Sequence, residues 1–327
     1  MNLMNNYSIF LKKGKCSHCK NNLVFERKYS GEHLCPICFV KNIEKIIYKT
    51  ISKYKMLSPR DNIVSALSGG KDSITLLYNL NKIQKKKYSS ESLTALIIDE
   101  GIKDYRENSI KKAVEFCKQN EIEYHVVSFR EKVGLTLDEI IKIKKYRKDY
   151  KNACNYCATI RRRLLNDGAK ELGGNVLALG HNITDFAETF LMNVLYKRLP
   201  LIANQYLFKN YENVNKYYIK KINPLMRIPE EEIFLYANIK EFEYYSSHCP
   251  YREKDPILRK RVLNFIQKCK KYSPEIEFNL LNGFLDLSKI LYEQCIQTDY
   301  YYCQNCGYPC GKSNYCNFCT YLNEFNH

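Results

Sequence analysis

The stretch LSGGKDS at residues 67–73 decides the fold of this 327-residue chain. It overlaps the end of a short apolar run, NIVSALSGG at residues 62–70, and it precedes ITLLYNLNKIQ at residues 74–84. The second segment places four apolar residues on one helical face: Ile74, Leu77, Leu80 and Ile83. A strand, a glycine turn and a helix in this order bring backbone N–H groups and a helix N-terminus to one point. The stretch therefore predicts a phosphate-binding loop.

Each residue type in this loop suits an anion. Gly69 and Gly70 let backbone N–H groups approach closely, Lys71 adds a positive charge, and Ser68 and Ser73 add hydroxyl donors. The alternative is an ordinary turn with a capping side chain. The six residues together at a strand-to-helix junction favour phosphate binding.

The loop is not a Walker A motif, although its physics is related. That motif needs a glycine where this chain has Ser65, and a serine or threonine where this chain has Asp72. The prediction rests instead on the glycines, the lysine and the helix N-terminus.

Strands and helices continue to alternate beyond the loop. Further elements are expected as strands at 92–101, 123–129 and 175–182 and as a helix at 110–120. This order predicts an α/β, Rossmann-like domain with a parallel sheet, in which ligands bind beyond the carboxyl ends of the strands. PEEEIFLYANIK at 229–240 begins as a helix should, whereas 210–218 is expected to be a loop.

A four-cysteine motif lies near each end of the chain. The motifs are Cys16-x2-Cys19 with Cys35-x2-Cys38, and Cys303-x2-Cys306 with Cys316-x2-Cys319. Each set can close a tetrahedron around one Zn²⁺, and such closed sites fold small ribbons and do no chemistry. His18, His33 and Cys310 lie nearby and are left out, because each site already has four thiolates. We expect zinc modules at 1–45 and 298–327 around a domain of residues 46–297.

The bulk properties favour a nucleic-acid partner. The net charge is +17, with 28 tyrosines and no tryptophan. Positive charge attracts phosphates and aromatic rings stack on unpaired bases, whereas the alternative is an ordinary surface in a Lys-, Asn- and Tyr-rich proteome. No apolar run reaches the roughly 18 residues of a membrane span, and the N-terminus lacks a signal-peptide pattern, so we expect a cytoplasmic protein without membrane contact. Fifteen cysteines then indicate metal binding or catalysis rather than disulfides.

A third cysteine pair lies in the middle of the chain, in KNACNYCATIRRR at residues 151–163. Residues 142–163 carry nine Lys or Arg and one acid. This excess suits contacts with phosphates, although a solvated helix face is the alternative for the first part of the run. The remaining cysteines carry no motif and are expected to be ordinary core or surface thiols: Cys117, Cys269 and Cys295.

The motifs together resemble one enzyme family. Ser68-Gly-Gly-Lys-Asp-Ser73 resembles the pyrophosphatase loop of the ATP-dependent PP-loop enzymes, which cleave ATP between the α and β phosphates and adenylate a carbonyl oxygen. Four further stretches restrict the resemblance to one group within these enzymes: DEGIKDYR (99–106), CNYC (154–157), GHNITDFAET (180–189) and HCPYR (248–252). With a zinc module at each end, the chain is similar to the TtuA/NcsA-type tRNA 2-thiouridine synthetases, which include the archaeal and eukaryotic cytosolic tRNA thiolases. The motifs keep the family's order from Cys16 to Cys319.

The resemblance implies a role for the central cysteines. Cys154, Cys157 and Cys249 match the three thiolates that hold a 4Fe-4S cluster in such enzymes, with the fourth iron open to hold a sulfide. The residues agree, since three thiolates are one short of a closed site and a chemical role requires an open position. Two alternatives stay open: a redox or persulfide pair, and a third zinc site with His248 as fourth ligand.

The resemblance also implies catalytic residues. Arg161 matches a Lys or Arg that contacts ATP or the substrate, whereas Arg162 and Arg163 are expected to contact tRNA or to be structural. Asp185 is the candidate catalytic acid, although Thr184 stands where many relatives have an aspartate. A helix N-cap is the alternative for Thr184 and Asp185.

The expected nucleotide site draws on the loop and on the end of the fourth strand. Its residues are Ala66, Ser68, Gly69, Gly70, Lys71, Asp72, Ser73, Arg161, Gly180 and His181. Asp99 and Glu100, at the end of the second strand, are further candidates for contacts with Mg²⁺ or ribose.

The implied activity is that of a tRNA uridine 2-sulfurtransferase. ATP would adenylate the uridine C2 oxygen, and cluster-assisted sulfur insertion would give 2-thiouridine, with the wobble uridine slightly favoured over a T-loop uridine. The implied cofactors are ATP, Mg²⁺, a 4Fe-4S cluster and two Zn²⁺. The implied partners are tRNA, a second copy of the chain, and a sulfur donor that is a ubiquitin-like thiocarboxylate protein or sulfide.

Other functions remain to be weighed against this one. They are a PP-loop thiolase that uses a cysteine persulfide, another PP-loop activity such as a cytidine thiolase or a lysidine-type ligase, and a non-catalytic RNA-binding zinc-ribbon scaffold. The intact SGGKDS loop counts against the scaffold, and the terminal zinc modules count against the other PP-loop activities.

Overall fold

A computed structural model describes residues 12–87, 93–147, 150–207, 217–251, 257–295, 301–310 and 313–325. The loop expected at 210–218 lies outside these ranges except for Tyr217 and Tyr218, which form no regular element. No helix within the described ranges is both long enough and apolar enough to cross a membrane.

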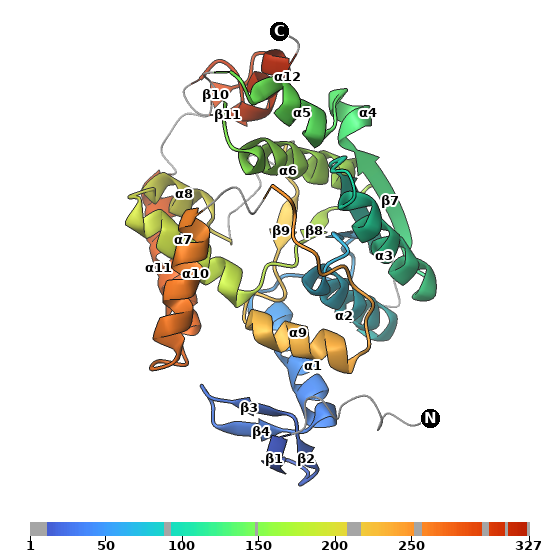
Figure 1. Cartoon of the computed structure of the whole chain (residues 1–327), viewed down its shortest axis with the longest axis vertical. Helices are drawn as coiled ribbons and strands as arrows, with labels where there is room; N and C mark the ends of the chain where they lie inside the picture. Colours follow the sequence, from blue (N-terminus) through green and yellow to red (C-terminus); the bar gives the residue numbers. More distant parts are fainter. Residues whose placement is uncertain are drawn as a thin grey trace.

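A five-stranded parallel sheet forms the centre of the described chain (Figure 1). Its order is β7-β6-β5-β8-β9, with β5 at Ile63–Ala66, β6 at Leu93–Asp99, β7 at Glu123–Ser128, β8 at Val176–Ala178 and β9 at Lys220–Ile222. The four predicted strands all form, each shorter than its predicted range. Strand β9 was not predicted, because its three residues, Lys-Lys-Ile, lack the apolar run of a buried strand.

Alternation along the strands explains why the sheet has helices on both faces. In β6, Ala95 and Ile97 pack into one hydrophobic cluster, whereas Leu96 and Ile98 pack into another. Successive side chains of a strand point to opposite faces, so this strand is buried on both sides. One face is covered by α2 (Lys71–Lys87), α3 (Arg106–Gln119) and α9 (Glu230–Ile239), and the other by α5 (Leu137–Lys144) and α6 (Ala153–Glu171).

The N-terminal module is joined to this domain by one continuous helix. Two short hairpins form the module, β1 (Lys12–Lys15) with β2 (Asn22–Leu23), and β3 (Phe25–Arg27) with β4 (Glu32–Leu34). Helix α1 (Pro36–Lys53) then runs into the central domain, and the expected boundary at residue 45 lies inside it. Arg27 forms a buried ion pair with Glu232 of α9 at 2.5 Å, which fixes the module to the domain.

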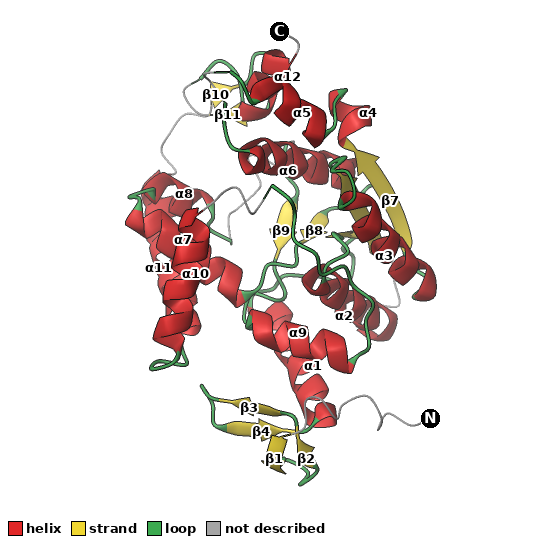
Figure 2. Cartoon of the chain, in the orientation of Figure 1, coloured by secondary structure: helices red, strands yellow, loops and turns green. Residues whose placement is uncertain are grey.

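The remaining helices lie beside the sheet or at the C-terminal end (Figure 2). A helical group packs at one side and consists of α7 (Ile183–Leu195), α8 (Leu199–Asn204), α10 (Ile257–Lys270) and α11 (Ile276–Cys295). The short α4 (Phe129–Val133) follows β7. The C-terminal module has β10 (Tyr301–Tyr302), β11 (Pro309–Cys310) and α12 (Asn317–Phe325), and it lies at the opposite end of the molecule from the N-terminal module.

Candidate active site at the carboxyl edge of the sheet

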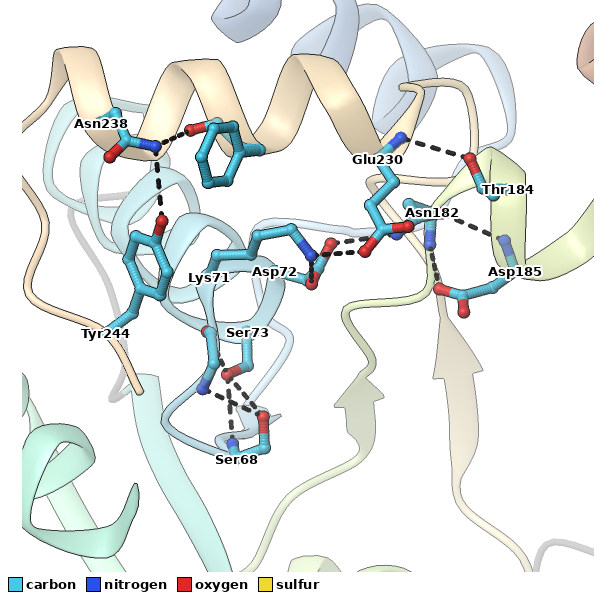
Figure 3. Close-up of polar contacts among 12 residues, drawn as sticks. Ser68, Lys71, Asp72, Ser73, Asn182, Thr184, Asp185, Glu230, Asn238 and Tyr244 are labelled. Atoms are coloured by element: carbon cyan, nitrogen blue, oxygen red, sulfur yellow. Dashed lines mark hydrogen bonds and ion pairs between the residues drawn. The ribbon is translucent and has the colours of Figure 1, made fainter. Parts of the chain in front are cut away.

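The predicted phosphate loop leaves β5 and leads directly into α2 (Figure 3). Ser73 Oγ accepts a hydrogen bond from Ser68 N at 3.1 Å and donates to the carbonyl of Gly70 at 3.0 Å. Ser68 Oγ in turn accepts from Gly70 N at 3.3 Å. The two serines therefore fix a tight turn at the N-terminus of α2, where backbone N–H groups and the helix dipole favour an anion.

Two segments distant in sequence hold this loop in place. Arg106 Nη1 donates to the carbonyl of Ser68 at 2.7 Å. Tyr245 N donates to the carbonyl of Gly69 at 2.9 Å. The loop is thus tied to α3 and to the extended segment that leads toward Cys249. Neither Arg106 nor Tyr245 was predicted to hold the loop, although Arg106 ends the DEGIKDYR motif.

Gly69 is the residue of the loop that tolerates substitution least. Its φ is +86°, and a Cβ there would lie 2.1 Å from the carbonyl oxygen of Ser109. We expect Gly69→Ala to lower the free energy of unfolding by more than the roughly 1–2 kcal/mol of left-handed backbone strain, because backbone must also move. ATP affinity should fall with it. Denaturant unfolding and ATP titration measure both effects.

The matched control for this prediction is Gly134→Ala. Gly134 has nearly the same φ, +83°, but a Cβ there would point into open space, with no atom within 4 Å. The control carries the backbone strain without the clash. Equal losses of stability in the two variants would contradict the close approach of the loop to α3.

Acidic side chains surround Lys71 in this structure. Lys71 Nζ lies 2.9 Å from Asp72 Oδ2 and 2.7 Å from Glu230 Oε1, and Asn182 Nδ2 donates to Asp72 Oδ1 at 3.0 Å (Figure 3). Burial lowers the pKa of Lys71, but attraction to Asp72 and Glu230 outweighs it and the pKa is raised. Burial raises the pKa of Asp72, against the attraction of Lys71. The lysine therefore stays positive, beside the start of α2 where phosphate charge is expected.

The end of β8 lies against the start of α2. A Cβ on Gly180 would lie 3.3 Å from backbone atoms of Asp72 and Ser73, so a glycine permits this close approach. His181 Nδ1 lies 3.1 Å from Asn223 Oδ1, in the segment that follows β9. The predicted nucleotide residues of the loop and of the fourth strand are therefore brought together at one edge of the sheet.

Asp185 and Thr184 have structural partners at the start of α7. Asn182 is the N-cap, and it forms a reciprocal capping box with Asp185, with bonds of 3.1 Å in both directions. Thr184 Oγ1 donates to Glu277 Oε1 at 2.6 Å. Capping is the alternative that the sequence left open for this pair. Asp185 nevertheless lies close enough to Asp72 for its charge to raise the pKa of that carboxyl.

The three central cysteines gather around the first turn of α6. Cys154 and Cys157 lie three residues apart at the start of that helix. Burial raises the pKa of Cys157 to about 12, Arg161 opposes this rise, and the charges of Glu100, Cys249 and Cys154 add to it. Cys157 and Cys249 also pack against the same hydrophobic cluster. The cysteines thus share one electrostatic environment, at the N-terminus of a helix that has no acid in its first turn.

A chain of charges, buried at Glu100 and Arg106 and about half exposed at Arg161, joins the central cysteines to the phosphate loop. Arg161 Nη1 lies 3.5 Å from Glu100 Oε1, and Glu100 Oε2 lies 2.6 Å from Arg106 Nε. Arg106 also bonds to the carbonyl of Ile98 at the end of β6 and to the loop at Ser68. Glu100 is 5% exposed and engaged by two arginines, so a Mg²⁺ or ribose contact by Glu100 would require an arginine to move. Asp99 Oδ1 accepts from Gly101 N at 2.9 Å in a turn beside it.

We expect Glu100→Gln to act through this chain of charges and not through a metal. Breaking a buried ion pair should cost on the order of 3 kcal/mol of unfolding free energy, because Arg106 loses its compensating charge. The Mg²⁺ concentration needed for half-maximal activity should stay as in the parent protein. Asp99→Asn is the control, and a large rise in Mg²⁺ requirement in Glu100→Gln alone would contradict this assignment.

The family is decided by comparison with known proteins. A family model described as a PP-loop domain matches residues 40–266. The chain belongs to the PP-loop family. This confirms the family predicted from SGGKDS.

Relatives of the PP-loop domain extend the likeness over nearly the whole chain. A protein of Methanocaldococcus jannaschii named "Probable sulfurtransferase" is 35% identical over 308 residues, which cover 94% of this chain and 86% of that protein. The "tRNA 2-thiolation protein NcsA" of Haloferax volcanii is 31% identical over 310 residues, covering 90% of this chain and 94% of that protein. The solved U34-tRNA thiolase NcsA from Methanococcus maripaludis, with its 4Fe-4S cluster, matches with a TM-score of 0.78 at 30% identity, over 95% of this chain and 96% of that one. The predicted resemblance to PP-loop tRNA thiolases is confirmed.

The terminal cysteines form a compact group at each end of the PP-loop domain. In each group the four ligand atoms lie within 4.8 Å of one another: Cys16, Cys19, Cys35 and Cys38, and Cys303, Cys306, Cys316 and Cys319. Sulfur–sulfur distances of 3.4, 3.5 and 3.7 Å approach the roughly 3.8 Å edge of a tetrahedron with Zn–S bonds of about 2.3 Å. His18 pairs with Glu32 instead, and Cys310 donates to the carbonyl of Ser313. Each group of four cysteines therefore fits one zinc ion of its own.

Cys154, Cys157 and Cys249 do not form such a compact group. Within the described ranges, only the two terminal sets bring three or more ligand atoms within 4.8 Å of one another. A multi-iron cluster holds its thiolates farther apart than a single ion does, so a looser arrangement suits a cluster better than zinc. The looser arrangement argues against a single ion shared by the three cysteines, and the iron–sulfur assignment of these residues stays a prediction.

Part of the basic run before α6 faces the C-terminal module rather than solvent. Lys144 is fully buried and lies 2.9 Å from Glu324 Oε2 of α12. Arg147 Nη1 donates to the carbonyl of Glu324 at 3.3 Å. Phosphate contacts and a solvated helix face were the two predictions for this run, and neither fits Lys144.

Proposed function

We propose that the chain is a tRNA uridine 2-sulfurtransferase that uses ATP to adenylate the C2 oxygen of a uridine and then replaces AMP with sulfur. The observation that carries the proposal is the physical connection between the phosphate loop and the central cysteines. One route runs from Ser68 through Arg106, Glu100 and Arg161 toward Cys157. Another runs from Gly69 to Tyr245, four residues before Cys249. The thiolation activities named for the relatives support the same reaction.

The loop residues have a direct role in the first half of this reaction. The C2 oxygen attacks the α-phosphate, the bond to the bridging oxygen breaks, and pyrophosphate leaves. Backbone N–H groups of Gly69 and Gly70 and the ammonium of Lys71 would neutralise the negative charge that develops on the phosphates. Lys71 would exchange Asp72 and Glu230 for phosphate oxygens, and Asp185, whose charge reaches Asp72, stays the candidate catalytic acid.

The central cysteines serve the second half, in which the C2–O bond breaks and a C2–S bond forms. Cys154, Cys157 and Cys249 would hold a 4Fe-4S cluster, which supplies an iron site without a protein ligand at which sulfur can be delivered. Arg161 lies beside these thiolates and Glu100, where its charge would stabilise the thiolates and the departing AMP. A persulfide on one of these cysteines is the alternative carrier of sulfur, and the iron content of the protein distinguishes the two.

The proposed substrate is a tRNA, with the wobble uridine slightly favoured over a T-loop uridine. The net charge of +17 suits a phosphate backbone, and exposed Arg162, next to Arg161 on α6, would meet the tRNA beside the site. The uridine must leave its stack to reach the phosphate loop. The proposed setting is the cytoplasm, and the sulfur donor is a ubiquitin-like thiocarboxylate protein or sulfide.

The test is nucleoside mass spectrometry of unmodified tRNA after anaerobic incubation with the protein, ATP, Mg²⁺ and sulfide. The proposal expects 2-thiouridine only when ATP is present, with AMP and pyrophosphate as products. Position is read from digested fragments. Binding of tRNA without consumption of ATP would favour the scaffold instead, and a thiolated cytidine would place the chain with other PP-loop enzymes.

We propose that two copies pair through an apolar surface at the junction of α7 and α8. Five large apolar residues are exposed there: Val194, Leu195, Tyr196, Leu199 and Leu201. Contiguous exposed apolar side chains of this kind favour a protein contact. We expect Leu195→Glu to convert a dimer to a monomer, because it would bury charge in the contact. Light scattering measures the mass, and Phe265→Glu, also exposed but on α10, is the control. A monomeric parent protein would contradict the pairing.

A further inference from the structure

Helix α6 presents two functional faces. Cys154, Cys157 and Arg161 recur at intervals of three and four residues and share one side. Tyr156 and Arg163, seven residues apart, share the opposite side two turns apart. The first face belongs to the candidate active site. The second face meets the C-terminal module, which the proposed reaction does not use.

Arg163 joins α6 to a member of the C-terminal cysteine group. Its Nη1 donates to Cys306 Sγ at 3.4 Å, and its guanidinium lies 3.5 Å from the ring centre of Tyr308. Phe318 of α12 lies on the guanidinium at 5.0 Å. The carboxylate of Asp167, one turn along α6, accepts hydrogen bonds from Arg163 Nε and from the hydroxyl of Tyr308. The side chain is therefore fixed by a thiol, two rings and a carboxylate at once.

A second contact between α6 and the C-terminal module is made by Tyr156, which lies between the two cysteines in sequence. Tyr156, on the helix between Cys154 and Cys157, is fully buried. Its ring lies 4.8 Å from Tyr321 and 5.9 Å from Phe325, both on α12. Helix α12 begins at Asn317, directly after Cys316, and contains Cys319, so its position depends on the same cysteine group.

We infer that the C-terminal four-cysteine module is a metal-dependent clamp on α6, with Arg163 as the positioning residue that ties Cys306 to the helix carrying Cys154 and Cys157. Without a metal, four thiols this close hold the module only weakly, since closed thiolate sites contribute folding energy through the ion. Zinc in the module would then hold Tyr308 and α12 in place. These in turn hold the far face of α6, and with it the two cysteines of the active site.

The test compares Arg163→Lys with Arg162→Lys in the full, metal-loaded chain. Both variants keep a positive charge on α6, but only the first removes the planar guanidinium that stacks on Tyr308 and reaches Cys306. Amide hydrogen exchange is followed in α6, in residues 301–325 and in α1. The N-terminal cysteine group has no contact with this face and serves as the internal reference within the described structure.

In Arg163→Lys we expect exchange to rise about tenfold in α6 and in residues 301–325 together, in line with the loss of a group that supports a metal ligand. Exchange in α1 should not change, and hydrogen exchange in Arg162→Lys, measured without tRNA, should match exchange in the parent protein. Zinc should also leave the variant faster from one of its two sites. Faster exchange in the C-terminal module with α6 unchanged would overturn the clamp, as would parent-like exchange in both.

Tyr308→Phe is a milder variant in case Arg163→Lys folds poorly. It keeps the ring against Arg163 but removes the hydroxyl that bonds to Asp167 and Asn166. A smaller, parallel rise in exchange in α6 and the module would support the clamp, and a rise confined to the module would contradict it.

A further readout is the rate at which iron is lost from the protein to a chelator, which should be faster in Arg163→Lys than in Arg162→Lys. This readout rests on the proposed function, whereas hydrogen exchange does not. A chain that never binds iron would therefore overturn the proposed function and leave the clamp to be decided by exchange.

Discussion

Cys157→Ala should abolish ATP-dependent thiolation of tRNA and remove iron from the protein. The thiol lies at the start of α6 beside Arg161, and its pKa responds to the charges of Cys154 and Cys249. Loss of a residue that merely supports a metal ligand costs about 10- to 100-fold in affinity or activity, and loss of a ligand should cost more. Iron content and 2-thiouridine yield are measured on the same anaerobic preparation.

The matched control for this variant is Cys269→Ala. Cys269 is a partly exposed cysteine on α10 that belongs to no motif. It should keep its iron and its activity. Release of pyrophosphate from ATP should persist in Cys157→Ala, because adenylation depends on the phosphate loop. Full thiolation by Cys157→Ala would contradict the role of the central cysteines.

Lys71→Ala should lower the rate of adenylation by about 100- to 1000-fold, the cost of losing one group that stabilises transition-state charge. In this structure Lys71 is held between Asp72 and Glu230 at the start of α2. Without it these carboxylates would repel the phosphates. Pyrophosphate release under saturating tRNA measures the effect. Iron content should be unchanged, because the ion pairs of Lys71 in the described chain are with Asp72 and Glu230, and neither carboxylate belongs to the surroundings of the central cysteines.

Lys112→Ala is the control for charge. Lys112, on α3, also contacts two carboxylates, those of Glu115 and Glu243, but its side chain is 34% exposed and it is not part of the phosphate loop. Its loss should leave adenylation unchanged. A loss of activity in Lys112→Ala as large as in Lys71→Ala would show that overall charge, rather than a group at the loop, controls the reaction.

The local signals in the sequence were enough for the fold and for the two terminal metal sites. Buried strands leave apolar runs, a strand–glycine–helix junction leaves SGGKDS, and zinc ribbons leave paired cysteines. Strand β9 was not predicted because two of its three residues are lysines, although it completes the sheet beside β8. Its burial depends on neighbours and not on its own composition.

The candidate site was only partly predictable, because several of its contacts join residues far apart in sequence. The hydrogen bond from Arg106 to Ser68 and the ion pair of Arg161 with Glu100 form only in the folded chain. The capping box of Asn182 and Asp185 is different, since an Asn followed three residues later by an acid is visible in the sequence. That local signal assigns Asp185 a structural partner, and its catalytic role stays a prediction.

Cys154, Cys157 and Cys249 are proposed to hold an open iron–sulfur cluster beside an ATP site. The deciding measurement is the iron, sulfide and zinc content of protein purified without oxygen, with Cys154→Ala prepared in parallel. We expect about four iron and four sulfide in addition to zinc in the two terminal sites, with iron and sulfide lost in the variant. Zinc alone, in a preparation fully active in thiolation, would contradict it and would point to a persulfide on one of the three cysteines.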